Sequence, residues 1–127
     1  MRKHHLLGAI LLCGGLFSCS SEVIQQANYE IIPLPQEIKI STGNFVLNDR
    51  TSIVYPKGND EMQQNANLLA TYIRQMSGKK LKVIDEQITS NVITLTTGLN
   101  TDNAEAYQLK VTPDNIIIRG ASEAGTF

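Results

Sequence analysis

The sequence has no tryptophan and only two cysteines and two histidines among its 127 residues. His4, His5 and Cys13 all lie near the N-terminus, so the chain beyond Cys19 contains no imidazole and no thiol. A Ser-His-Asp triad, a Cys-His pair, a disulfide and an ordinary zinc site are therefore excluded from that part of the chain.

The sequence also has no excess of charge of either sign, since the formal net charge is −1. Charged residues make up 18% of the chain. Nucleic-acid-binding domains usually carry a clear excess of basic residues, and we expect no nucleic-acid partner here. Apolar residues make up 42% of the chain, a composition typical of a globular domain rather than a disordered one.

The N-terminus reads as a targeting segment. Arg2 and Lys3 precede an apolar stretch over residues 6–17, "LLGAILLCGGLF". This stretch is shorter than the roughly 20 residues that span a bilayer, but it suits the apolar region of a secretory signal peptide. We therefore predict a signal peptide over residues 1–18, and its removal takes the formal charge from −1 to −3.

The signal peptide ends in "LFSC", which resembles the bacterial lipobox, with Cys19 as the lipidated residue. An ordinary signal peptide with a chance cysteine is the alternative. The lipoprotein interpretation makes residues 19–28 a lipidated tether and the lipid on Cys19 the only membrane contact. It predicts a location in the envelope of a Gram-negative bacterium, at the outer membrane or in the periplasm.

One amphipathic helix is expected over residues 61–77. Asp60 followed by Gln63 suits a capping box, and Gly78 suits the C-terminal stop. The apolar residues of this segment are spaced four and three apart, which predicts a core-facing stripe of Met62, Ala66, Leu69, Ile73 and Met76.

Most of the remaining chain is expected to form strands, separated by turn residues. Residues 107–111 and 116–119 suit a hairpin closed at Pro113, and a further helix is expected at about Ser122. Many strands with one main helix predict an α+β fold, a two-layer sandwich whose mixed or mostly antiparallel sheet packs against the helix. The other expected strands lie near residues 38–40, 45–48, 52–56, 80–84 and 92–96.

The charged motifs give no active site. Asp60-Glu61 and Asp85-Glu86 are adjacent carboxylates, but neighbours on a strand point to opposite faces, whereas a catalytic acid–base pair faces one reacting bond across about 5 to 9 Å. Lys79, Lys80 and Lys82 suit a solvated sheet edge. No phosphate loop or cofactor motif is present, and we assign no catalytic, cofactor or metal residue.

The two ends of the remaining chain resemble a known family. "YEIIPLPQEIKISTGNFVLND" is similar to the opening, and "AYQLKVTPDNIIIRGASEAGTF" to the close, of the N-terminal domain of bacterial β-N-acetylhexosaminidases of glycoside hydrolase family 20. The matching features are Ile31–Ile38, the helix near 61–77 and the small-residue turn Ala124–Phe127. The resemblance covers residues 29–127.

The resemblance implies a non-catalytic accessory domain of a larger enzyme. Family members continue after this turn with a helix and a catalytic (β/α)8 barrel, which is absent here and would be the domain's partner in the same chain. The catalytic Asp-Glu of the family follows a His-x-Gly-Gly-type stretch that this sequence lacks, so no catalytic residue carries over. The parent would release terminal N-acetyl-hexosamine by a retaining, substrate-assisted route without a cofactor.

Two alternatives stay open on the sequence. One is the front domain of a related glycosidase, of family 84 or an α-glucuronidase, although "IIPLPQEI" favours family 20. The other is a stand-alone envelope lipoprotein domain that binds a glycan or a protein. A glycan binder needs exposed aromatics, whereas Tyr72 and Tyr107 have core-like spacing. As an accessory domain, the isolated chain should expose an apolar patch near residues 116–127, with docking through the helix-free sheet face or the C-terminal edge.

Overall fold

The computed structural model describes residues 34–127. The predicted signal peptide, Cys19 and the tether up to residue 28 lie outside the described residues. The chain divides into two compact units, and the second is Lys39–Phe127. That second unit contains the helices and strands described below.

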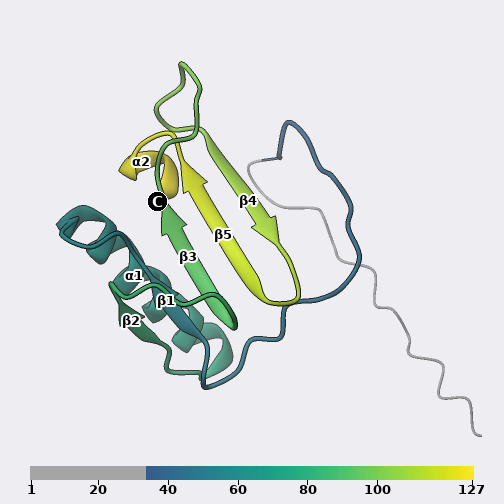
Figure 1. Ribbon diagram of the computed structural model, residues 1–127, viewed down its shortest axis with the longest axis vertical. Helices are drawn as coiled ribbons and strands as arrows, with labels where there is room; N and C mark the ends of the chain where they lie inside the picture. The colour runs from purple at the N-terminus through teal and green to yellow at the C-terminus, as the bar shows by residue number, and fades with distance from the viewer. Residues whose placement is uncertain (1–33) are drawn as a thin grey trace, which may run out of the picture. The chain divides into compact units, whose positions relative to one another are not determined.

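A five-stranded sheet and two helices make up this unit, which confirms the α+β fold with a mixed sheet (Figure 1). The strand order is β2-β1-β3-β5-β4. In chain order the elements are β1 (Ser52–Val54), α1 (Asp60–Ser77), β2 (Lys82–Ile84), β3 (Val92–Thr96), β4 (Tyr107–Val111), β5 (Asn115–Gly120) and α2 (Glu123–Thr126).

The sheet is mostly parallel, so the expectation that antiparallel pairs dominate is wrong. β1 pairs in parallel with β2 and β3, and β3 pairs in parallel with β5. Only the β4–β5 hairpin is antiparallel among the described strands. The reason is topological: α1 carries the chain back between β1 and β2, and such a crossover connects parallel strands.

The predicted helix is confirmed, but its cap lies one residue earlier than expected. Asn59, not Asp60, is the N-cap, and its Oδ1 accepts a hydrogen bond from the Met62 N–H at 3.0 Å. Asp60 is the first residue of the helix, where its negative carboxylate stabilises the positive end of the helix dipole. Gly78 ends the helix as predicted, with φ of 73°, and its N–H bonds to the Arg74 carbonyl at 2.9 Å.

The core lies between α1 and the sheet. α1 packs against β1, β2 and β3, and Met62 and Ala66 of the predicted stripe are fully buried. Met76 is 89% exposed, so its assignment to the core is wrong. An 18-residue helix is about 27 Å long, whereas three-residue strands such as β1 span about 10 Å, so the last turn has little sheet beneath it.

Residues 39–50 have no strand, so both strands expected before β1, at 38–40 and 45–48, are wrong. Gly43 adopts φ of 91° and lies close to the ring of Pro113; a Cβ there would come within 2.7 Å of Pro113 Cγ. Phe45 and Leu47 nevertheless pack against the core, while Val46 between them is exposed. The expected alternation is therefore present as packing but not as a hydrogen-bonded strand.

The hairpin and the following helix are confirmed. Thr112 donates its backbone N–H to the Asn115 carbonyl at 2.8 Å, which closes the turn between β4 and β5. Ser122 is the N-cap of α2, as the sequence predicts. Gly125 lies so close to the β3–β4 connection that a Cβ would be 2.5 Å from the Ala106 oxygen, which explains the small residue there. Within residues 34–127 no helix is long and apolar enough to cross a membrane.

Candidate functional site

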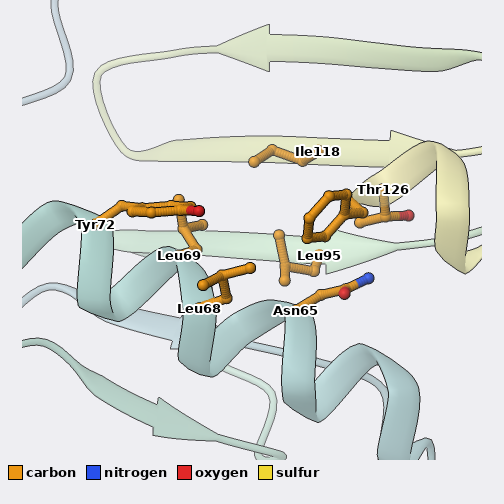
Figure 2. Close-up of a pocket in the computed structure, with 8 residues that line it drawn as sticks. Asn65, Leu68, Leu69, Tyr72, Leu95, Ile118 and Thr126 are labelled. Atoms are coloured by element: carbon orange, nitrogen blue, oxygen red, sulfur yellow. The ribbon is translucent and has the colours of Figure 1, made fainter.

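An apolar groove lies between α1 and the side of the sheet where β5 and α2 meet (Figure 2). α1 supplies one wall, Leu95 of β3 and Ile118 of β5 form the floor, and α2 closes one end. The cavity has a volume of about 250 Å³ and is lined by Asn65, Leu68, Leu69, Tyr72, Leu95, Ile118, Thr126 and Phe127.

β4 continues this apolar surface on the same face of the sheet. Leu109 pairs with Ile118 across the hairpin, and residues directly opposite in a sheet share a face. Tyr107 and Val111 alternate with Leu109 and share that face as well. These three side chains are 45 to 50% exposed. The exposed apolar residues of β4 thus lie on the helix-bearing face, whereas the sequence led us to expect docking through the helix-free face or the C-terminal edge.

The two tyrosines with core-like spacing are half exposed, contrary to expectation. Tyr72 is 52% exposed beside the groove and Tyr107 is 45% exposed on β4. Their spacing correctly places them on an apolar face, but no element among the described residues covers them fully. Phe127, next to α2, is 78% exposed and is the second aromatic residue in the lining of the groove, after Tyr72.

Side-chain hydrogen bonds fix α2 at the end of the groove. Asn59 Nδ2 donates to Glu123 Oε1 at 2.9 Å, and Asn65 Nδ2 donates to the Glu123 carbonyl at 3.0 Å. The hydrogen bond from Asn59 lowers the pKa of the Glu123 carboxyl, and the residue's own backbone N–H adds to this effect. Thr126 Oγ1 also donates to the Thr96 carbonyl at 3.3 Å, which joins α2 to β3.

The lining of the groove contains no acid, base or nucleophile beyond the Thr126 and Tyr72 hydroxyls. The two carboxylate pairs lie elsewhere: Asp60-Glu61 begin α1, Asp85-Glu86 follow β2, and all four residues are exposed. No group of three potential metal ligands occurs within residues 34–127. The groove can bind an apolar surface, but it has no group placed for acid–base chemistry.

The lysine cluster lies where the sequence placed it, at a sheet edge. Lys82 begins the edge strand β2, and Lys80 beside it is exposed. Lys79 Nζ lies 3.7 Å from Asp49 Oδ1, which ties the α1–β2 connection to the residues before β1.

A polar cluster at the start of the strands is structural. Thr51 Oγ1 donates to Asn91 Oδ1 at 2.7 Å, and the amide groups of Asn48 and Asn91 exchange two hydrogen bonds. Asn91 adopts the left-handed φ of 53°, which asparagine tolerates better than most residues. The donors and acceptors of these side chains satisfy one another, so the cluster stabilises the start of β1 and β3.

Sequence reasoning missed the groove and Leu68 in its lining, whereas Phe127 lies in the range 116–127 where we expected an exposed apolar patch. Leu68 and Tyr72 are four residues apart, so they form a second apolar stripe beside the core stripe of α1. This second stripe was the signal that could have revealed the groove, because a helix that packs only against a sheet needs only one apolar stripe. The width of the apolar surface on α1 therefore predicts a second contact.

Comparisons with known proteins agree with this fold. The family described as glycosyl hydrolase family 20, domain 2, matches residues 28–127. No curated protein sequence matches the chain.

Among solved structures, the chain is similar to one described as the GH20 beta-N-acetylhexosaminidase from Streptomyces coelicolor A3(2), with 21% identity and a TM-score of 0.68. The match covers 76% of this chain and 19% of that chain, so this chain spans about a fifth of that enzyme. At this identity the likeness supports the fold, whereas the family match extends over most of the sequence. The chain belongs to glycosyl hydrolase family 20, in which it represents domain 2.

Proposed function

We propose that this chain is the accessory, non-catalytic domain of a lipid-anchored β-N-acetylhexosaminidase. The whole enzyme would hydrolyse terminal non-reducing N-acetyl-hexosamine residues by a retaining, substrate-assisted mechanism, with a catalytic (β/α)8 barrel outside these 127 residues. The observation that carries the proposal is the family match over residues 28–127, together with a groove that has no acid–base group in its lining.

The role of the domain would be to pack against the rest of the enzyme. The groove and the face of β4 form one apolar surface that includes Tyr72, Leu109 and Phe127, each at least half exposed. Apolar patches of this kind on a small domain commonly mark an interface. The enzyme's other parts would cover this surface and would receive support from the sheet.

The aliphatic lining argues against the stand-alone glycan binder. Sugars present many hydroxyl groups, whereas the floor of the groove is Leu95 and Ile118. Asn65 lines the groove, but its Nδ2 already donates to the Glu123 carbonyl. Tyr72 and Tyr107 are exposed, as a glycan binder would require, but the lining of the groove beside Tyr72 is mainly apolar.

The activity test compares two proteins made from the same gene. This chain and the product of the complete reading frame would be assayed with a chromogenic N-acetylglucosaminide. We expect turnover from the complete product only. Turnover by the purified 127-residue chain would contradict the proposal that catalysis lies elsewhere, and a reading frame with no barrel would favour the stand-alone lipoprotein.

The lipid anchor is tested separately by feeding cells a labelled fatty acid. Cys19→Ser should abolish incorporation of label into the protein. Cys13→Ser is the matched control, because Cys13 lies inside the apolar segment of the signal peptide and should leave incorporation unchanged. Label that persists in Cys19→Ser would show that Cys19 is not the lipidated residue.

A further inference from the structure

Acidic side chains gather at one end of the sheet. β1, β2, β3 and β5 are mutually parallel, so their carboxyl ends lie at the same end. Each of these strands is followed by acidic residues, either in the loop after the strand or in the first turn of the helix that comes next. These residues are Asp60, Glu61, Asp85, Glu86, Asp102, Glu105 and Glu123.

The opposite end, where the parallel strands begin, carries the basic residues. Lys82 pairs with Ser52 in the register of β1 and β2, and Arg50 and Lys80 precede these two residues by two positions each. The ion pair between Lys79 and Asp49 joins the same two segments. We define the basic end as Arg50, Arg74, Lys79, Lys80 and Lys82, all exposed except the half-buried Lys79.

The basic end keeps an excess of positive charge. Asp49 offsets Lys79, and Asp114 lies near the start of β3, where its carbonyl accepts the Asn91 N–H at 2.7 Å. Arg50, Lys80 and Lys82 have no ion pair shorter than 4 Å within residues 34–127. Although the overall charge is only −1, basic residues gather at one end of the sheet and acidic residues at the other.

The segment of this unit that leads into β1 passes the basic end. Gly43 lies against Pro113 in the β4–β5 turn, which stands at the end where β5 begins. The following residues run from that turn to the start of β1, as Figure 1 shows.

We propose that the basic end is a binding surface for phosphate-bearing lipid headgroups, so that an anionic bilayer lies against it. Exposed cations spread over two segments suit a charged surface better than a small ligand. Each lysine or arginine near an anionic bilayer strengthens binding roughly fivefold. A lipid chain and a basic surface together give stable attachment where either alone is weak. The lipid anchor itself rests on the proposed function, whereas the charge distribution does not.

The first test is a lysine acetylation footprint of the full chain, read by mass spectrometry on vesicles. With phosphatidylglycerol vesicles at low salt, Lys80 and Lys82 should react at least about threefold more slowly than with phosphatidylcholine vesicles. Lys57, which follows β1 at the acidic end, is the internal control and should react equally with both. High salt should remove the difference, since the Debye length falls to about 3 Å at 1 M. Equal protection of Lys57 and Lys80, or no protection of either, would overturn the proposal.

A pair of variants gives the second test. Lys80→Gln/Lys82→Gln should weaken binding to phosphatidylglycerol vesicles by roughly 25-fold relative to phosphatidylcholine vesicles. The control Lys57→Gln/Arg119→Gln removes two exposed charges away from the basic end and should leave that ratio unchanged. Equal effects of the two variants would mean that only net charge matters. The N-terminal apolar segment enters both vesicle types, so the ratio isolates the charges. Neither readout uses lipidation or glycosidase activity, so this inference and the proposed function fail independently.

Discussion

Two halves of one sheet face differ sharply in burial. On the half covered by α1, Ile53 of β1 is 0% exposed and Ile93 of β3 is 4% exposed. On the other half, Leu109 and Val111 of β4 point to the same face and are 50% and 45% exposed. Side chains of the same kind, in strands of one sheet, thus differ because of what lies opposite them.

The width of one helix explains the difference. A helix with its side chains is about 10 Å across, and neighbouring strands are about 4.8 Å apart, so one helix covers two or three strands. α1 packs on β1, β2 and β3, and the short α2 packs mainly at the end of β5. A sheet of five strands therefore keeps an apolar margin along β4.

The largest effect should come from truncating the covered half. Ile53→Ala removes a fully buried side chain beneath α1 and should lower the free energy of unfolding by about 2 to 5 kcal/mol, measured by urea denaturation. Leu109→Ala, on the same face of β4, should cost less than about 1 kcal/mol. Similar losses in the two variants would mean that the halves are equally packed, and the comparison would fail.

The contact between the start of α1 and α2 should give an intermediate effect on stability. Asn59→Ala removes the N-cap of α1 and its hydrogen bond to Glu123, and should cost about 1 kcal/mol. Asn67→Ala is the matched control, because Asn67 is exposed in the middle of the same helix, where alanine is the better helix former. A loss in Asn67→Ala as large as in Asn59→Ala would argue against a specific capping role.

A polar substitution on the uncovered half should have little effect on stability. Leu109→Gln should change the free energy of unfolding by about 0.5 kcal/mol or less, as for exposed positions generally. It should also reduce binding of a dye that fluoresces on apolar surfaces. A loss above about 2 kcal/mol would show that β4 is covered in solution.

The smallest effect concerns pH. The pKa of Glu123 is lowered, chiefly by Asn59, so its contribution to stability is complete above the ordinary carboxyl pKa and is lost as the pH falls through the lowered value. Glu123→Gln should therefore show a smaller loss of melting temperature in acid than the unaltered chain. Glu105→Gln, an exposed carboxyl in the β3–β4 connection, should keep the original pH dependence.

Local patterns predicted the local elements well. The spacing of Met62, Ala66 and Leu69 identified α1, and the alternation from Tyr107 to Val111 identified the hairpin. The parallel pairing of β1 with β2 and β3 was beyond such patterns, because it depends on strand order and not on neighbouring residues. Periodicity likewise placed Met76 on an apolar side without revealing that little sheet lies beneath it.

The sequence predicted less of the candidate site than it predicted of the fold. The resemblance at the two ends of the chain identified the family correctly. The absence of catalytic residues, which we inferred in part from the lack of histidine, stays a prediction. The groove depends on how α1, β3, β5 and α2 pack together, which no single stretch encodes. Lipidation of Cys19 stays a prediction, because that residue lies outside the described part of the chain.

The strand order also bears on how the chain folds. Val111 and Ile116 pair across a turn of four residues, whereas Ser52 pairs with Lys82 and Val92, 30 and 40 residues away. Closing long loops costs more entropy and slows folding, so we expect the β4–β5 hairpin to form early and β1 to join late. The half of the sheet that buries least apolar surface would then be the half that nucleates the other.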